Sequence, residues 1–174
     1  MPIYTRTGDD GTTAIFGGKR VLKCEELVDV YGSIDELNSW VGLINAQLKF
    51  PLSNIQSNLL TIGSSLAGSK IHLTSLEQRI TEMEKYIDTM DKELPKLTSF
   101  ILPGGSVLAA QIHITRSVCR RVERQTVSLS KKQHIDPVIV KYLNRFSDLL
   151  FTLARFINKQ GKIRETVWSD IPRK

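Results

Sequence analysis

Five stretches of apolar residues with helical spacing, separated by breaks that contain proline or glycine, limit this chain to a helical fold. In the first stretch the apolar residues stand three or four positions apart and so line one face of a helix: Leu27, Val30, Ile34, Leu37, Val41, Ile44 and Leu48. Similar stripes follow within residues 53–68, 74–95, 106–129 and 137–161. Strand-like alternation is confined to a few residues near the N-terminus. We therefore predict an all-α fold, a five-helix antiparallel bundle of the ferritin-like kind with short connections.

Helix start and stop signals support these boundaries. Three start signals are a Ser–Gln capping box, a Thr–Glu capping box and an N-cap aspartate followed by proline, at Ser53 and Gln56, Thr74 and Glu77, and Asp136 and Pro137. Pro51 closes the first helix and Pro95 the third, and the fourth begins at Ser106. Residues 94–106 hold two prolines and two glycines, which predicts a loop, and Phe100 makes that loop unusually apolar.

The length and composition indicate one soluble domain. A chain of 174 residues with 41% hydrophobic content can build one core and is short for two. Neither a signal peptide nor an apolar run of about 18 residues is present, so we expect a cytoplasmic protein without a membrane partner. Cys24 and Cys119 stand too far apart in sequence for a CxxC metal site or a disulfide framework.

Positive charge gathers in the second half of the chain. Residues 1–100 have a net charge of −3 and residues 101–174 a net charge of +9, which indicates an anion-binding surface. On the fourth helix, five polar side chains share an arc of about 100°: His113, Arg116, Arg120, Glu123 and Arg124. Guanidinium groups bind phosphate oxygens in pairs, so this stripe is either a triphosphate clamp or a solvated basic face.

Two other helices carry polar groups on one face. On the fifth helix these are Asn144, Asp148, Phe151 and Arg155, and on the first they are Asp35, Asn38 and Gly42. A buried Asn144 needs a hydrogen-bonding partner, either an adenine or ribose or a neighbouring helix. Asp35 needs an arginine of another helix or chain if it is buried.

The N-terminal run TRTGDDGTTAIFGGKRVLK has the composition of a phosphate-binding loop, and a flexible surface arm is the alternative. It is neither a Walker A motif nor a dinucleotide-binding fingerprint. Glu-x-x-His, HExxH and G-x-S-x-G motifs are also missing, so we predict no di-iron centre, no protein-held metal and no obvious protein nucleophile.

The chain resembles the PduO-type corrinoid adenosyltransferases in five segments, which follow one another in this order: YTRTGDDGTTAIFGGKRVLK, VYGSIDELNSWVGL, FILPGGS, HITRSVCRRVER and KYLNRFSDLLFTLAR. The resemblance implies a single cobalamin adenosyltransferase domain over residues 1–174. It divides into an N-terminal ATP-binding loop (1–23), a helix bundle (24–160) and a C-terminal tail (161–174). The family resemblance further implies a homotrimer that binds ATP between two subunits.

The resemblance also implies roles for particular residues. Those that bind ATP are Thr5, Arg6, Thr7, Gly8, Asp9, Gly11, Thr12, Thr13 and Lys23 in the loop, and Arg120, Glu123, Arg124 and Asn144 on the helices. Asp35 and Arg116 correspond to positions that pair between subunits. Phe100 corresponds to an aromatic residue that occupies the lower face of the corrin. The catalytic set is therefore Arg116, Arg120, Arg124, Phe100 and Asp35.

The implied reaction is that of an ATP:cob(I)alamin adenosyltransferase, with ATP, Mg²⁺ and a corrinoid. A reductase and an adenosylcobalamin-dependent acceptor enzyme are the implied further partners. Two rival functions remain open at this point: a basic helical module that binds nucleic acid, and a regulator that binds ATP without turnover. Glu123, Asp9 and Asp10 would face nucleic-acid phosphates poorly without a metal, so we expect no nucleic-acid partner.

Overall fold

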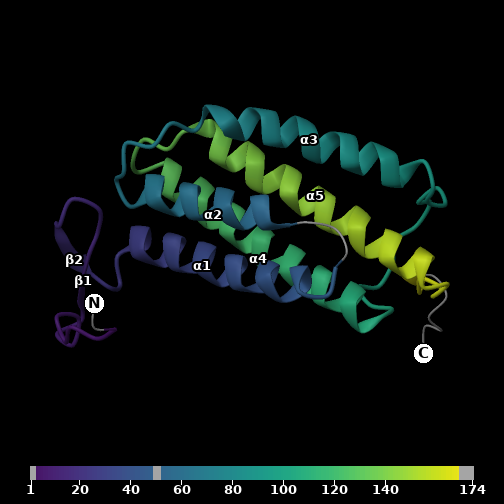
Figure 1. Cartoon of the computed structure of the whole chain (residues 1–174), viewed down its shortest axis with the longest axis horizontal. Helices are drawn as coiled ribbons and strands as arrows, with labels where there is room; N and C mark the ends of the chain where they lie inside the picture. Colours follow the sequence, from purple (N-terminus) through teal and green to yellow (C-terminus); the bar gives the residue numbers. More distant parts are fainter. Residues whose placement is uncertain (1–2, 49–51, 169–174) are drawn as a thin grey trace.

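The computed structural model describes residues 3–48 and 52–168, and in these it contains five helices and one small sheet (Figure 1). The elements in chain order are β1 (Thr12–Ala14), β2 (Arg20–Leu22), α1 (Glu26–Asn45), α2 (Ser53–Leu66), α3 (Thr74–Asp91), α4 (Val107–Ser130) and α5 (Pro137–Gln160). The five helices confirm the mostly helical fold predicted from the apolar stripes. None of the helices in these ranges is both long and apolar enough to cross a membrane.

The helices form a bundle in which α1 packs against α2 and α4, α4 packs against α5, and α5 packs against α3 (Figure 1). The expectation of antiparallel neighbours is wrong for one pair, because α3 and α5 run in the same direction. Glu77 pairs with Lys141 near the starts of the two helices, and Glu93 pairs with Lys159 beyond the end of α3 and near that of α5. Because α3 and α5 both run opposite to α4, they are parallel to each other.

The core is built from the predicted apolar stripes. On α1 the buried residues are Val30, Ile34, Leu37, Val41 and Ile44, as the spacing indicated. On α5 even the large Tyr142 and Phe146 are 0% exposed, because this helix is covered by both α3 and α4. Burying one such apolar side chain stabilises the fold by about 1.5–3 kcal/mol. The core therefore fixes the rotation of α5 about its axis and, with it, every polar group on that helix.

The two helices that border the candidate site begin as their sequences predict. The Ser106 hydroxyl accepts a hydrogen bond from the Ala109 amide at 3.1 Å, and the Asp136 carboxylate accepts one from the Val138 amide at 3.0 Å. Each satisfies an amide that the first helical turn leaves unpaired. The starts of α4 and α5 are thus fixed by side-chain caps.

The two predicted capping boxes are not formed. The N-cap residues of α2 and α3 are Leu52 and Leu73, so Ser53 and Thr74 lie inside the first turns. Both leucines are buried, which indicates that their packing against the core, and not a side-chain cap, sets where these helices begin. Pro51, the predicted end of the first helix region, lies outside the described residues.

The all-α expectation also needs a correction at the N-terminus, where β1 and β2 pair as an antiparallel hairpin with Thr13 opposite Val21. β-branched residues favour strands, and here they stand on both sides of a turn. Gly17 and Gly18 adopt φ angles of 85° and 83°, which side chains disfavour. The hairpin extends beyond the start of α1, at the edge of the bundle (Figure 1).

The 94–106 loop ends in a turn that only glycine fits. Gly105 has a φ of 106°, and a Cβ placed there would lie 2.2 Å from Oδ1 of the buried Asn158. At the neighbouring Gly104 a Cβ would meet no atom within 4 Å, and its φ is not in the left-handed region. The two adjacent glycines therefore differ sharply in what they tolerate.

We expect Gly105→Ala to lower the free energy of unfolding by at least about 2 kcal/mol, through backbone strain and the displaced Asn158 side chain. Gly104→Ala is the matched control, and we expect it to change stability by less than about 0.5 kcal/mol. Urea unfolding followed by circular dichroism measures both. Equal stability of the two variants would contradict the close approach of Asn158.

Candidate functional site

The predicted arginine stripe lies on the outer side of α4, beside α5. Arg120 and Arg124 are exposed, and Arg116 is half-buried. Among the described residues, none of these three arginines forms an ion pair. Like charges four residues apart on a helix cost only about 0.2–0.5 kcal/mol per pair, so the stripe alone does not require a ligand.

The environment of Arg116 indicates a missing ligand or second subunit more strongly than the charges of the stripe do. Its guanidinium lies 5.8 Å from the centre of the Phe151 ring, and its buried Nε has no hydrogen-bonding partner. Burial lowers the pKa of Arg116, and the charge of Arg120 lowers it further. A buried donor without a partner costs about 1–3 kcal/mol, which is more than the repulsion along the stripe. This side chain is therefore under-satisfied within one chain, as expected of a group that completes its contacts with a ligand or another subunit.

A cavity of about 400 Å³ lies directly beside Arg116 and Arg120. Its other lining residues are Ile87 and Asp91 of α3, Leu97 of the 94–106 loop, and Ser147, Asp148, Phe151, Thr152 and Arg155 of α5. The Asp148 carboxylate forms an ion pair with the Arg145 guanidinium, with 2.7 Å between Oδ2 and Nη1. The cavity thus combines three arginines with an aromatic ring, two aspartates and apolar side chains.

The structure brings Glu123 and Asn144 together at the edge of the arginine stripe. The Asn144 amide nitrogen donates a hydrogen bond of 3.0 Å to the Glu123 carboxylate. The partner of Asn144 within this chain is thus the neighbouring helix, one of the two options that the sequence left open. Both side chains stand next to Arg120 and Arg124 on the helices, so the four predicted helical ATP-binding positions form one group.

Sequence reasoning did not assign site roles to Ser147, Asp148 and Phe151, although all three line the cavity with Arg116. The sequence predicts a polar face on the fifth helix, but of its residues only Asn144 is assigned to the ATP site. The signal that could have found Asp148 and Phe151 is the spacing of three or four residues from Asn144 through Asp148 and Phe151 to Arg155.

The N-terminal loop has a structure of its own. The Lys23 ammonium donates a 2.7 Å hydrogen bond to the Gly8 carbonyl, and the Arg20 guanidinium donates to the Thr7 carbonyl and the Thr12 hydroxyl. Asp10, in turn, accepts from the amide and hydroxyl of Thr12, and these bonds lower the pKa of its carboxyl group. The predicted binding residues Thr5, Arg6, Thr7, Gly8, Asp9, Gly11, Thr12, Thr13 and Lys23 are therefore held in one shaped loop.

Two backbone conformations contribute to this shape. Arg6 has a φ of 60° and Gly11 a φ of 82°. The first is uncommon for a residue with a side chain and marks a locally constrained segment.

The structure does not bring this loop to the arginine stripe of the same chain. Within residues 3–48 and 52–168, no hydrogen bond or ion pair joins the segment 3–23 to α4 or α5, and the Phe16 amide bonds instead to the Ala67 carbonyl after α2. Figure 1 shows the loop beyond the start of α1, outside the bundle. The two halves of the predicted ATP site are thus separate within one chain.

Asp35 also stands apart from Arg116 in the same chain. It is exposed on α1 and borders a groove of about 400 Å³ between α1 and α2, lined also by Tyr31, Gly32, Ile34, Asn38, Leu59, Leu60, Gly63, Ser64 and Ala67. The amide oxygen of Asn38 in this groove is buried without a partner. An exposed carboxylate beside an unpartnered amide leaves the groove open to a further polar contact.

Phe100 is 82% exposed in the 94–106 loop. Its backbone carbonyl accepts a 2.9 Å hydrogen bond from the Trp168 amide. Leu97 of the same loop lines the cavity beside Arg116, so Phe100 belongs to the same end of the bundle as the cavity.

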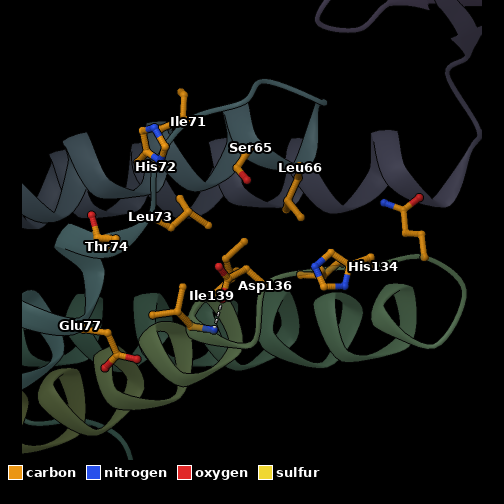
Figure 2. A pocket seen from close by; sticks show the side chains of 13 residues that line it. Ser65, Leu66, Ile71, His72, Leu73, Thr74, Glu77, His134, Asp136 and Ile139 are labelled. Atoms are coloured by element: carbon orange, nitrogen blue, oxygen red, sulfur yellow. Dashed lines mark hydrogen bonds between the residues drawn. The ribbon is translucent and has the colours of Figure 1, made fainter.

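A larger cavity, about 570 Å³, lies at the other end of the bundle, between the 71–77 and 133–139 segments. Figure 2 shows His72 and His134 on separate sides of it. Its carboxylates have structural partners: Asp136 caps α5, and Glu77 pairs with Lys141 at 2.9 Å. We therefore place the candidate site at the arginine stripe and not in this cavity.

Comparisons of the sequence with a family model and with known proteins point to the same family. The sequence model of the cobalamin adenosyltransferase family matches residues 3–157. A cobalamin adenosyltransferase from Cupriavidus metallidurans is 40% identical over 172 residues, covering 95% of this chain and 93% of that protein. The corrinoid adenosyltransferase PduO of Citrobacter freundii is 43% identical over 166 residues, which are 89% of this chain and 49% of that protein. The chain thus spans about half of the Citrobacter protein.

The fold is shared with a solved structure. This is a phenylalanine-to-alanine variant of the PduO-type ATP:corrinoid adenosyltransferase from Lactobacillus reuteri, complexed with cobalamin and ATP. The TM-score is 0.89 and the sequence identity 34%, over 97% of this chain and 100% of that chain.

His113, next to Arg116 in the site, makes stability depend on pH. Its side chain is 3% exposed, its ring lies 6.1 Å from that of Phe151, and its Nδ1 has no partner. Burial, with a smaller effect of Arg116, lowers the pKa of His113 from 6.5 to about 4. Between these two values the unfolded chain binds a proton that the folded chain excludes, so stability falls as the pH falls.

We expect this histidine to remove up to about 3 kcal/mol of stability between pH 7 and pH 4. Urea unfolding at several pH values should therefore show a steeper acid loss in the wild type than in His113→Gln, which cannot titrate there. Other acid-sensitive groups are common to both proteins and cancel in the difference. Identical pH slopes would show that His113 is protonated freely in the folded state.

Proposed function

Because this chain belongs to the cobalamin adenosyltransferase family, we propose that it transfers the 5′-deoxyadenosyl group of ATP to the Co(I) centre of a corrinoid, releasing inorganic triphosphate. The α4–α5 face carries the proposal: Arg116, Arg120 and Arg124 stand together without an ion-pair partner among the described residues. A bound triphosphate would supply the missing negative charge. The names of the relatives point to the same reaction.

The proposed step needs no nucleophile from the protein. Co(I) of the corrinoid substrate donates an electron pair to the ribose C5′, a cobalt–carbon bond forms, and the C5′–O bond breaks as triphosphate leaves. Arg120, Arg124 and Lys23 stabilise the negative charge that grows on the triphosphate. Removing one such contact typically raises a barrier by about 3 kcal/mol. The remaining contribution of the chain is to align ATP with the corrinoid and to exclude water.

We assign Mg²⁺ to the triphosphate and not to a protein cage. In the described ranges no three His, Cys, Asp or Glu side chains are grouped so as to hold a metal ion. Mg²⁺ commonly keeps several waters and binds substrate phosphates with one or two carboxylates, so Glu123 beside the arginines is the residue suited to assist. Bound there, the ion would neutralise part of the triphosphate charge.

The site is completed by a second copy of the chain in a homotrimer. The N-terminal loop and the arginine stripe are separate within one chain, and the proposal assigns phosphate binding to both. The loop of one subunit then covers the α4–α5 face of the next. Asp35 pairs with Arg116 of the partner subunit. This ion pair gives a partner both to the exposed carboxylate and to the under-satisfied guanidinium.

Phe100 has a separate task in this proposal. Its exposed ring occupies the lower face of the corrin in place of the nitrogen ligand, which makes cobalt easier to reduce. A reductase that supplies the electron and an adenosylcobalamin-dependent enzyme that accepts the product are the further partners that we propose.

Arg124→Ala tests the function most directly. Arg124 is exposed and forms no ion pair among the described residues, so we expect unchanged stability and a fall in kcat/KM of at least about a hundredfold. The assay mixes ATP, Mg²⁺ and Co(I)alamin without oxygen and follows the Co(I) absorbance and triphosphate release. The matched control is Arg79→Ala, because the ion pair of Arg79 is with Glu82 of its own helix, away from the arginine stripe.

Unchanged kinetics in Arg124→Ala would remove this arginine from the site. ATP binding by the wild type without Co(I)-dependent triphosphate release would instead indicate a regulator. Salt-sensitive binding of RNA or DNA in place of ATP would favour the nucleic-acid module.

A mixing experiment tests the shared site. Lys23→Ala damages the loop and Arg124→Ala the helical face, so each homotrimer alone should be nearly inactive. If each site takes its loop from one subunit and its helices from another, a one-to-one random mixture restores about one quarter of all sites, which is about one third of the sites in the mixed trimers. Coexpression with two different affinity tags isolates the mixed trimers. Activity no higher than that of the single variants would show that one chain supplies both halves.

A further inference from the structure

The 94–106 loop, which carries Phe100, is attached to α5 near both of its ends. The two side chains responsible are Arg155 and Asn158, which stand one helical turn apart and are only 4% and 2% exposed. Polar groups this deeply buried mostly have hydrogen-bonding partners. Their hydrogen-bonding partners are backbone groups near the two ends of the loop and one carboxylate that follows α5.

Arg155 holds the first end. Its Nη2 donates a 2.9 Å hydrogen bond to the Pro95 carbonyl. Its Nε lies 3.1 and 3.2 Å from the two carboxylate oxygens of Glu165, whose side chain is 18% exposed. One guanidinium therefore ties together α5, the start of the loop and the segment that follows α5.

That following segment lies along the middle of the loop as a short strand-like partner. The Leu102 amide donates to the Thr166 carbonyl at 2.8 Å, and the Trp168 amide donates to the Phe100 carbonyl at 2.9 Å. Between these bonds, Ile101 and Val167 form an antiparallel bridge. Because Glu165 directly precedes this pairing, its bond to Arg155 sets the register of the segment against the loop.

Asn158 holds the second end. Its Nδ2 donates to the Gly104 carbonyl at 2.9 Å, and its Oδ1 accepts from the Ser106 amide at 3.0 Å. The close contact at Gly105, where a Cβ would overlap this amide, shows how tightly the turn is held. The start of α4 is thus fixed to α5 by the same residue.

Phe100 remains 82% exposed while its backbone carbonyl accepts the bond from the Trp168 amide. Because the ring is exposed, packing against the protein core does not fix its position. Its backbone must then supply the accuracy with which it meets a ligand. A mobile loop would instead lose ordering entropy each time the ligand bound.

We propose that Arg155, Glu165 and Asn158 are positioning residues that fix the 94–106 loop so that Phe100 meets the lower face of the corrin. The role of Phe100 in this statement rests on the function proposed above. The anchoring itself concerns only this chain and is measurable without substrate. Arg155 acts on Phe100 through the Pro95 carbonyl and through Glu165.

The experiment compares Arg155→Gln, Glu165→Gln and the double variant with the wild type. Lys141→Gln is the control, because Lys141 is likewise a cation of α5 that pairs with a carboxylate, that of Glu77 on α3, but far from the loop. Glu165→Gln is the safer single change for folding, because Glu165 lies after the last helix. Amide hydrogen exchange of residues 97–103 is read by mass spectrometry, with α1 and α4 peptides reporting on global stability.

We expect exchange in 97–103 to rise at least about tenfold in both single variants, with little change in α1 and α4. In the double variant two amides can bond to each other, so part of the protection should return. Unchanged exchange in both single variants would overturn the anchoring. So would equally raised exchange throughout the bundle in Glu165→Gln, because it would show only a general loss of stability.

A second readout follows the corrinoid. With Co(II)alamin and ATP bound, electron paramagnetic resonance reports the fraction of cobalt that has lost its lower nitrogen ligand. We expect this fraction to fall at least about threefold in Arg155→Gln, as in Phe100→Ala, while the KM for ATP stays within about twofold. A wild-type fraction in Arg155→Gln would overturn the positioning role. Failure of the wild type to form product would count against the proposed function alone, because the exchange result would still decide the anchoring.

Discussion

The burial of α5 between α3 and α4 is the constraint on which the other features of this structure depend. Side chains as large as Tyr142 and Phe146 are fully enclosed, so α5 cannot rotate or slide without opening the core. With the helix fixed, Asn144 meets Glu123, and Phe151 lies beneath Arg116. Further along, Arg155 and Asn158 hold the loop that carries Phe100. One packed helix thus positions Asn144 with Glu123, the cavity beside Arg116 and the loop that carries Phe100.

Incomplete hydrogen bonding marks the surfaces that we assign to function. The described residues contain four buried side-chain atoms without a partner, in Asn38, His113, Arg116 and Gln125. His113 and Arg116 lie on α4 beside the arginine stripe, and Asn38 lies in the groove that Asp35 borders. Gln125 lies on the other face of α4, where its amide nitrogen donates to Asp29 of α1. A buried unpaired group costs about 1–3 kcal/mol, which a fold tolerates where a ligand or a second subunit completes the contact. The same burial keeps His113 neutral.

The two halves of the proposed nucleotide site are prepared in different ways. The N-terminal loop is shaped by local contacts, of which the bonds from Lys23 to Gly8 and from Arg20 to Thr7 are the main ones. The helical half is shaped by the bundle core through α4 and α5. Each half is ordered by contacts within its own chain, so joining them requires little reorganisation. This suits a site that forms where two subunits meet.

The sequence by itself determined the five helices, the α1 stripe, the start of α4 at Ser106, the cap at Asp136, and the grouping of the arginines with Glu123. These depend on residues three or four apart, so helical periodicity suffices to predict them. The parallel course of α3 and α5, the unused capping boxes and the N-terminal hairpin were not predicted, because they depend on packing between distant segments. Only the tertiary structure showed that Arg155 and Asn158 fasten the 94–106 loop and that the N-terminal loop lies away from the arginines of its own chain. Contacts over 50 or more residues, such as that from Asn158 to Gly104, leave no periodic signal in a single sequence.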